Sequence, residues 1–322
     1  MSKHLKSGTI IVGYMFVYKF KKGGTNMYVN AIEKVTEYTR PFLSISRAYG
    51  ADVVEPSCAT IIIVNSEGWV LTCKHVAQQI KAAQDINNKY AQFKNEVKAL
   101  STGDKHYKSK LRALEKKYGY VKGKVVVQLK NQISVVDTCT GAEYFFHPEY
   151  DVALIRIDGF SKVLCNQFPV FAKDSSVLKQ GKSLCRLGYP YPEFSNFKYD
   201  AAKDDIEWTN AGRATTPLFP IDGILTRHVI GNGGRLFAVE MSTPGLRGQS
   251  GGPLFDTNGV VYGMQSSTLT LPLGFDQENR EIKVNGVSKK VNDYSFIHLG
   301  RCIHIDIIKE FMDAHGVKYQ VG

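Results

Sequence analysis

Residues 248–254 read Gly-Gln-Ser-Gly-Gly-Pro-Leu, and this stretch is the strongest signal in the chain. It lies between apolar runs at 236–241 and 260–264 that are typical of β-strands. Glycines beside a serine permit a tight turn that exposes the hydroxyl and lets backbone N–H groups converge on an oxyanion. Ser250 is therefore a candidate nucleophile, with the N–H groups of Gly248 and Ser250 as its oxyanion hole. An ordinary glycine-rich loop has the same composition, so this motif alone does not decide the function.

Two further motifs place polar residues at the ends of apolar strands. Residues 68–77 read Gly-Trp-Val-Leu-Thr-Cys-Lys-His-Val-Ala, so that an apolar run delivers His75. Residues 150–157 read Tyr-Asp-Val-Ala-Leu-Ile-Arg-Ile, so that Asp151 directly precedes another apolar run. Taken singly, such a histidine is usually structural, and such an aspartate fits a turn or a cap equally well.

In the chain order histidine, aspartate, serine, the three motifs resemble the trypsin-like serine proteases of the chymotrypsin fold. Within that family the sequence is most similar to bacterial HtrA-type protease domains, over about residues 31–311. Stretches without catalytic residues share the likeness, at 66–72, 175–181, 187–190, 222–226 and 303–311. An α/β-hydrolase would need the serine first in the chain and helices alternating with strands, and the sequence shows neither.

The resemblance implies a catalytic triad in which Ser250 is the nucleophile, His75 the general base and then acid, and Asp151 the group that orients the imidazole. The expected function is that of a serine endopeptidase, which hydrolyses peptide bonds in protein or peptide substrates through an acyl-enzyme. A regulatory protein partner or a conformational switch is expected to control it. No cofactor, no metal and no membrane partner are expected.

Short strands rich in Val, Ile, Phe and Tyr predict an all-β fold. With the resemblance, they predict two six-stranded antiparallel β-barrels with an inserted helical hairpin and a C-terminal helix. The expected organisation is an N-terminal extension (1–30), a first barrel (31–170) with the helical insertion at about 78–120, and a second barrel with the C-terminal helix (171–322). Asp306 is expected to cap that last helix.

The expected helical insertion is rich in Ala, Gln, Lys, Leu and Glu, and a Ser-Thr-Gly-Asp turn at 101–104 divides it. Ten Lys or Arg and four Asp or Glu lie between Lys81 and Lys117, and the whole chain has a formal charge of +11. A solvated lysine-rich face is the more frequent explanation of such an excess. The alternative function is an inactive or latent protease-fold module whose basic insertion recruits a partner or nucleic acid. Nucleic acid is disfavoured as a partner, although the net charge leaves it open.

The resemblance places the specificity pocket between two short segments, and none of their residues is charged: Pro244, Gly245 and Leu246 at the base, and Gln265, Ser266, Ser267 and Thr268 along the wall. A pocket without a carboxylate disfavours cleavage after Lys or Arg, because their charge would be buried without a partner. Small or medium apolar residues are favoured, while Arg247 leaves acidic residues open. Residues 266–268 are expected to pair with the substrate as an added strand.

Two departures from the family bear on regulation. Trypsin has an aspartate immediately before the nucleophile that receives a new N-terminal amine on zymogen cleavage, but Gln249 occupies this place. That activation is therefore not expected here. HtrA-type proteins usually continue into a peptide-binding PDZ domain, and the expectation here is a protease domain without one, because the sequence ends at Gly322.

The cysteines and the N-terminal run bear on the compartment. The six cysteines show neither paired spacing nor histidines at metal-ligand spacing, so buried free thiols are expected rather than zinc: Cys58, Cys73, Cys139, Cys165, Cys185 and Cys302. The apolar run at 9–18 is too short to span a bilayer and lacks a small-residue cleavage pattern, so it is interpreted as a strand. A cytoplasmic location is expected.

Overall fold

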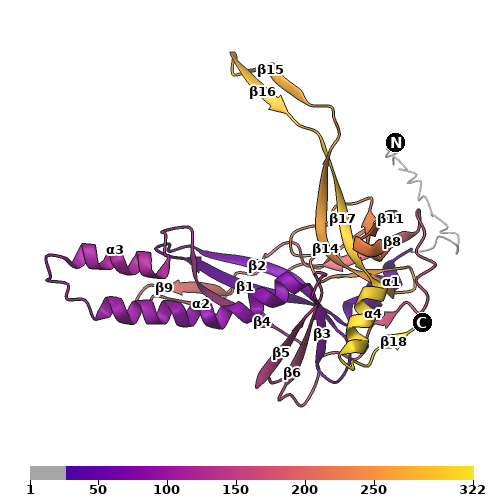
Figure 1. Ribbon diagram of the computed structural model, residues 1–322, viewed down its shortest axis with the longest axis horizontal. Coiled ribbons are helices and arrows are strands. Elements are labelled where there is room, and N and C mark those ends of the chain that lie inside the picture. Colours follow the sequence, from indigo (N-terminus) through magenta and orange to yellow (C-terminus); the bar gives the residue numbers. More distant parts are fainter. Residues whose placement is uncertain (1–26) are drawn as a thin grey trace, which may run out of the picture.

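The computed structural model describes residues 27–322. The interpretation of residues 9–18 as a strand, and most of the expected N-terminal extension, lie outside the described residues. A body of two β-sheets bears two long projections, one helical and one a β-hairpin (Figure 1). No helix in the described part of the chain is long and apolar enough to cross a lipid bilayer.

The first sheet has six antiparallel strands in the order β4-β1-β2-β3-β6-β5. Residues 59–63 of β2 are all buried, because this half of the strand faces the core on both sides. Among the described residues β4 and β5 do not pair with each other, so that this sheet forms a half-barrel. Its strands are β1 (Thr39–Ala48), β2 (Val54–Ile63), β3 (Trp69–Thr72), β4 (Val126–Ile133), β5 (Gly141–Phe146) and β6 (Ala153–Asp158).

The second sheet closes on itself, because β13 pairs with both β8 and β14. The closed barrel contains β8 (Ser183–Gly188), β11 (Phe219–Ile230), β12 (Leu236–Met241), β13 (Pro253–Phe255), β14 (Val260–Pro272) and β17 (Phe296–His304). Two short strands, β7 (Val170–Phe171) and β18 (Gln320–Val321), extend the sheet in parallel. The predicted fold class, an all-β fold of two six-stranded antiparallel β-barrels with an inserted helical hairpin and a C-terminal helix, is confirmed, with one barrel closed and the other open as a half-barrel.

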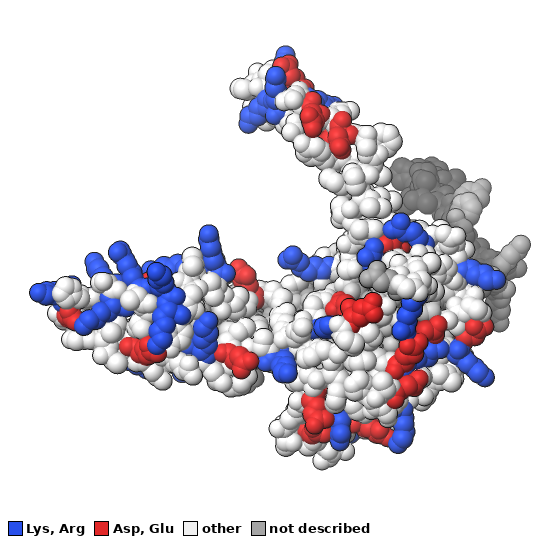
Figure 2. All heavy atoms as spheres, viewed as in Figure 1, with Lys and Arg blue, Asp and Glu red and all other residues white. Residues whose placement is uncertain are grey.

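A helical arm, consisting of α2 (Lys74–Lys98) and α3 (Tyr107–Tyr118), projects from the first sheet (Figure 1). It begins directly after β3, four residues before the expected start at 78. Gly119 ends α3 in the left-handed conformation (φ 73°), which glycine adopts at little cost. Tyr90 and Phe93 of α2 pack with Tyr49, Tyr120 and Val127 in a small core of their own. Lys and Arg side chains crowd this arm in the space-filling view (Figure 2).

Two long connections of the second sheet, 191–220 and 271–295, contain hairpins. The first is β9 (Phe197–Asp200) with β10 (Asp205–Trp208), and the second is β15 (Gln277–Val284) with β16 (Val287–Asp293), which projects from the body (Figure 1). A short 3-10 turn, η1 (Asn232–Gly234), joins β11 to β12. Sparse apolar alternation in these segments explains why their strands were not predicted.

Helices α1 (Val29–Thr36) and α4 (Ile305–Ala314) pack on the body. In α4 the residues Ile307, Ile308, Phe311 and Met312 are buried, as their helical spacing predicts. The expected cap is wrong: the ring of His304 accepts the N–H of Asp306, which itself lies in the first turn.

All six cysteines are free thiols. Three are buried (Cys73, Cys185 and Cys302) and two are half-buried (Cys58 and Cys165). The expectation of burial is wrong for Cys139, which is exposed in the connection between β4 and β5.

Candidate active site

His75 and Asp151 meet because β3 and β6 are antiparallel neighbours. Thr72 at the end of β3 is opposite Ala153 at the start of β6. His75 follows Thr72 by three residues, in the first turn of α2, and Asp151 precedes Ala153 by two. The register of two apolar strands thus brings both side chains to one end of the first sheet.

Asp151 holds the imidazole of His75 through several hydrogen bonds. Nδ1 of His75 lies 2.9 Å from Oδ2 and 3.1 Å from Oδ1 of Asp151, and the backbone N–H of His75 donates to Oδ1 at 3.1 Å. Burial alone would raise the pKa of Asp151, but hydrogen bonds from His75 and Ser266 outweigh it and lower the pKa to about 2. The carboxylate is therefore ionised at neutral pH and favours the tautomer of His75 with Nε2 free to accept a proton.

Ser266 links the acid to the candidate nucleophile. Its hydroxyl donates to Oδ2 of Asp151 at 2.6 Å, while its backbone carbonyl accepts the hydroxyl of Ser250 at 3.2 Å. Within residues 27–322, Ser250 has no hydrogen bond to His75. The sequence assigned Ser266 only to substrate binding, and its bond to Asp151 has no local signal because the two residues are 115 positions apart.

The turn before Ser250 requires glycine. Gly248 has φ 97°, and a side chain there would overlap the carbonyl oxygen of Tyr189. Its own carbonyl accepts the hydroxyl of Thr60 at 2.8 Å. In the described chain the N–H groups of Gly248 and Ser250 have no hydrogen-bond acceptor, so both are free to donate to an oxyanion.

Gln249 is fully buried and fixes the same turn from inside. Its Oε1 accepts the N–H of Leu246 at 3.0 Å, and its Nε2 donates to the carbonyl of Phe219 at 3.3 Å. Both ends of the amide are therefore satisfied by backbone groups, one in the turn and one at the start of β11, without an incoming N-terminal amine.

A hollow of about 340 Å³ opens beside Ser250, and we call it the specificity pocket. Six of the seven residues predicted to bind substrate line it, together with Arg247: Gly245, Leu246, Gln265, Ser266, Ser267 and Thr268. Pro244, the seventh, does not line it. Thr268 closes one side by donating its hydroxyl to the carbonyl of Gly245 at 2.6 Å.

The thiol of Cys73 lies close to the His75–Asp151 pair. The potential metal-ligand atoms of these three residues are within 4.8 Å of one another. Burial raises the pKa of Cys73 well above its usual value, which keeps the thiol protonated. The thiol donates to the carbonyl of Gln265 at 3.2 Å. The geometry of the pair itself, with Nδ1 of His75 held by Asp151, suits proton transfer by the imidazole.

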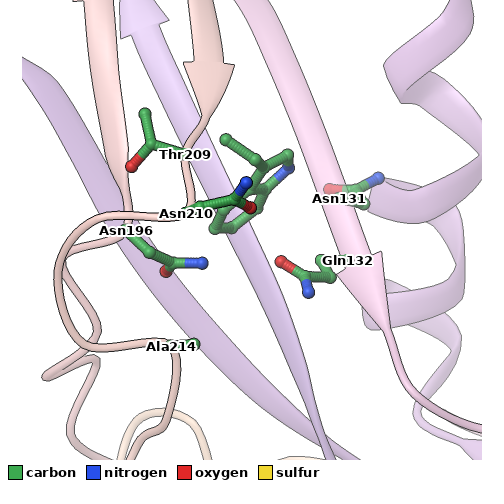
Figure 3. Close-up of a pocket in the computed structure, with 7 residues that line it drawn as sticks. Asn131, Gln132, Asn196, Thr209, Asn210 and Ala214 are labelled. Carbon is green, nitrogen blue, oxygen red and sulfur yellow. The ribbon is translucent and has the colours of Figure 1, made fainter.

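A larger hollow of about 430 Å³ lies away from these residues, beside β4 and β10. Figure 3 shows the amide side chains of Asn131, Gln132 and Asn196 around it, and Trp208 also lines it. No side chain in its lining is titratable. This hollow therefore offers hydrogen bonds but no acid–base or nucleophilic chemistry.

The chain matches the model of the trypsin-like peptidase domain over residues 59–264. No curated protein matches it. Among solved structures it is similar to HtrA-type protease AlgW with tripeptide (TM-score 0.43, 15% identity) and with decapeptide (TM-score 0.44, 14% identity). These alignments include 90% and 89% of this chain, which spans 64% and 66% of those chains, less than two thirds.

Proposed function

Because the chain belongs to the trypsin-like peptidase family, we propose that it is a serine endopeptidase with Ser250, His75 and Asp151 as its catalytic triad. One observation supports the proposal above all: Asp151 holds Nδ1 of His75, and Ser266 links the same carboxylate to Ser250. An aspartate that merely capped a strand would need neither bond.

The reaction follows from this arrangement. Nε2 of His75 takes the proton of Ser250 as Oγ attacks the carbonyl carbon of the scissile peptide bond. The resulting oxyanion accepts the free N–H groups of Gly248 and Ser250. His75 then gives its proton to the leaving amine, and water hydrolyses the acyl-enzyme by the reverse transfers. The hydroxyl of Ser250 must first leave the carbonyl of Ser266, which gives a conformational switch a place to act.

Covalent labelling tests the proposal directly. A fluorophosphonate should add to Ser250 in the folded protein, with the adduct assigned by peptide mass spectrometry. Ser250→Ala should not react, and His75→Ala should react at least about a thousandfold more slowly, because the hydroxyl has lost its base. A wild-type protein that is folded yet unlabelled after long exposure would contradict the assignment.

A second candidate function rests on the helical arm and its basic surface (Figure 2). Ser250 is bonded to Ser266 rather than to His75, as in a latent site. The arm would then recruit an acidic regulatory partner or nucleic acid. Binding of a nucleic acid that weakens steeply with salt, by a protein that does not label, would favour this function over peptidase activity. We also propose a cytoplasmic location for the protein, and cell fractionation would test it.

A further inference from the structure

Arg186 lies in β8 with its side chain inside the closed barrel, and none of its surface is exposed. Nη1 donates to Oε1 of Gln265 at 2.7 Å, and Nη2 donates to the carbonyl (3.0 Å) and the hydroxyl (2.6 Å) of Thr243. Nε has no partner in the described part of the chain. Every acceptor of this guanidinium is therefore a neutral group.

No carboxylate within residues 27–322 forms an ion pair with Arg186. The thiols of Cys185 and Cys302 lie nearby, but burial raises the pKa of each to about 12, so they stay neutral at physiological pH. Burial lowers the pKa of Arg186 itself, yet a guanidinium keeps its proton in proteins. The barrel thus contains one uncompensated positive charge, which is costly unless something else uses it.

The barrel is built to accommodate this side chain. A Cβ on Gly300, in the neighbouring part of β17, would overlap Nη1 of Arg186. Glycine at this strand position leaves the space that the guanidinium fills. The arginine is therefore a fixed part of the barrel interior.

Gln265 separates Arg186 from the specificity pocket and connects the two. Its amide orientation is set on both sides, because Oε1 accepts from Arg186 and Nε2 donates to the carbonyl of Ser267 at 2.7 Å. A Cβ on Gly245 would overlap Nε2, which places this nitrogen at the pocket wall. A cation on Oε1 polarises the amide and makes its N–H groups better donors.

The lining of the specificity pocket contains no acidic side chain to neutralise this charge. Its other polar side chains are the hydroxyls of Ser250, Ser266, Ser267 and Thr268, and Arg247, which is exposed. A basic or apolar substrate side chain would leave the buried cation uncompensated. A carboxylate would compensate it in surroundings of low dielectric constant, where the attraction is strong.

We propose that the specificity pocket takes an acidic side chain, glutamate or aspartate, from the residue that precedes the scissile bond. Arg186 acts through Gln265 as the residue that determines this specificity. The proposal rests on the proposed peptidase function and names its substrate class.

Peptidyl diphenyl phosphonates test this preference, because they add to the catalytic serine of an active site and carry a chosen side chain into the pocket. Reagents with glutamate and with its isostere glutamine should label wild-type protein at rates that differ by about 10- to 100-fold in favour of glutamate. Reagents with alanine or lysine should be slower than the glutamate reagent.

The variants identify the residue responsible. Arg186→Met should remove most of the difference between glutamate and glutamine, whereas the matched control Arg247→Gln should reduce it by no more than a few fold, because Arg247 is exposed. A fluorophosphonate, which carries no such side chain, shows whether each variant retains a competent nucleophile. If Arg186→Met does not fold, the comparison of glutamate with glutamine on wild-type protein still decides the preference.

The possible results separate the two proposals. Labelling by the fluorophosphonate with equal rates for glutamate and glutamine overturns the acidic pocket alone. A glutamate preference that survives in Arg186→Met overturns the role of Arg186. No labelling by any reagent overturns the proposed peptidase and, with it, the inference.

Discussion

Arg47 and Arg186 are the two buried arginines of residues 27–322, and the two sheets surround them differently. In the first sheet, Nη2 of Arg47 lies 2.6 Å from Oδ1 of Asp204, in the turn between β9 and β10. Gln128 accepts Nε at 2.6 Å and the carbonyl of Ala51 accepts Nη1 at 2.9 Å. Arg186 in the closed barrel has only neutral acceptors.

The difference concerns what each charge is for. Arg47 joins β1 to the helical arm and to the β9–β10 hairpin, because Tyr90 of α2 also donates to Asp204, at 2.6 Å. Its charge is neutralised within the fold, so its role is complete without a ligand. Arg186 contacts Gln265 in the wall of the specificity pocket, and its acceptors within the fold are all neutral, so the proposed acidic substrate side chain would compensate its charge. A buried arginine that pairs with a carboxylate of the fold has a structural role. A buried arginine without such a partner, beside a pocket, is a candidate for binding an acidic ligand.

The largest expected effect is on Asp204. Asp204→Ala removes the counter-ion of Arg47 and leaves the hydroxyls of Tyr90 and Tyr199 without their acceptor. Asp204 also has φ 50°, a left-handed conformation that alanine tolerates poorly. We expect the free energy of unfolding, measured in urea, to fall by about 4 kcal/mol.

The matched control is Glu193→Ala, which breaks the exposed pair with Arg213. Exposed pairs contribute less than about 1 kcal/mol, so this variant should hardly change the urea midpoint. If both variants lost the same unfolding free energy, the ion pair of Arg47 with Asp204 would contribute no more than an exposed pair. The contrast between Arg47 and Arg186 would then be wrong.

A smaller effect is expected at Gly300. Gly300→Ala forces a methyl group against Nη1 of Arg186 and should cost about 2 kcal/mol of unfolding free energy. The control is Gly141→Ala, in β5, where an added Cβ meets nothing within 4 Å and the change should stay within about 0.5 kcal/mol.

The double variant Gly300→Ala, Arg186→Met sharpens this result. If the guanidinium causes the clash, replacing it with the slimmer methionine should recover most of the loss, and a double-mutant cycle should show coupling. If the losses of unfolding free energy in the two single variants simply added, the methyl group at position 300 would not contact Arg186. The guanidinium would then lie elsewhere in the barrel.

The sequence singled out His75 and Asp151 because each lies at the end or the start of a strongly apolar run, and Ser250 because it lies in a glycine-rich turn. Trp69–Thr72 and Ala153–Asp158 are recognisable strands, and the polar residue at the end of each is prominent. The sequence also predicted most of the pocket lining by resemblance. These features depend on local pattern and chain order, which a single sequence contains.

Arg186 and Ser266 could not be predicted in the same way. Arginine in a strand usually faces solvent, but residues 184–188 of β8 are all buried, so that Arg186 is buried whichever face of the strand it is on. The bonds of Ser266 to Asp151 and of Arg186 to Gln265 join residues far apart in the chain. They depend on how the sheets pack, which has no local signature.

The smallest expected effect is the acid response of the two arginine sites. Burial raises the pKa of Asp204, but hydrogen bonds from Tyr90 and Tyr199 and the charge of Arg47 outweigh it and lower the pKa below its usual value. The stability that this shift contributes is therefore present above the unfolded-state pKa of about 3.9 and is lost as the pH falls through the folded-state pKa. No thiol beside Arg186 titrates in this range.

Urea unfolding of wild-type protein and Asp204→Asn between pH 6 and 2 tests this response, with asparagine chosen because it tolerates a left-handed backbone. The advantage of the wild type should be constant above about pH 5 and shrink below pH 4, while the titration of Asp151 affects both proteins equally and cancels. The difference between wild type and Arg186→Met should not change over the same range. A pH-independent advantage over Asp204→Asn would show that the ionised carboxylate does not compensate Arg47, and the contrast between the two arginines would then rest on packing instead of charge.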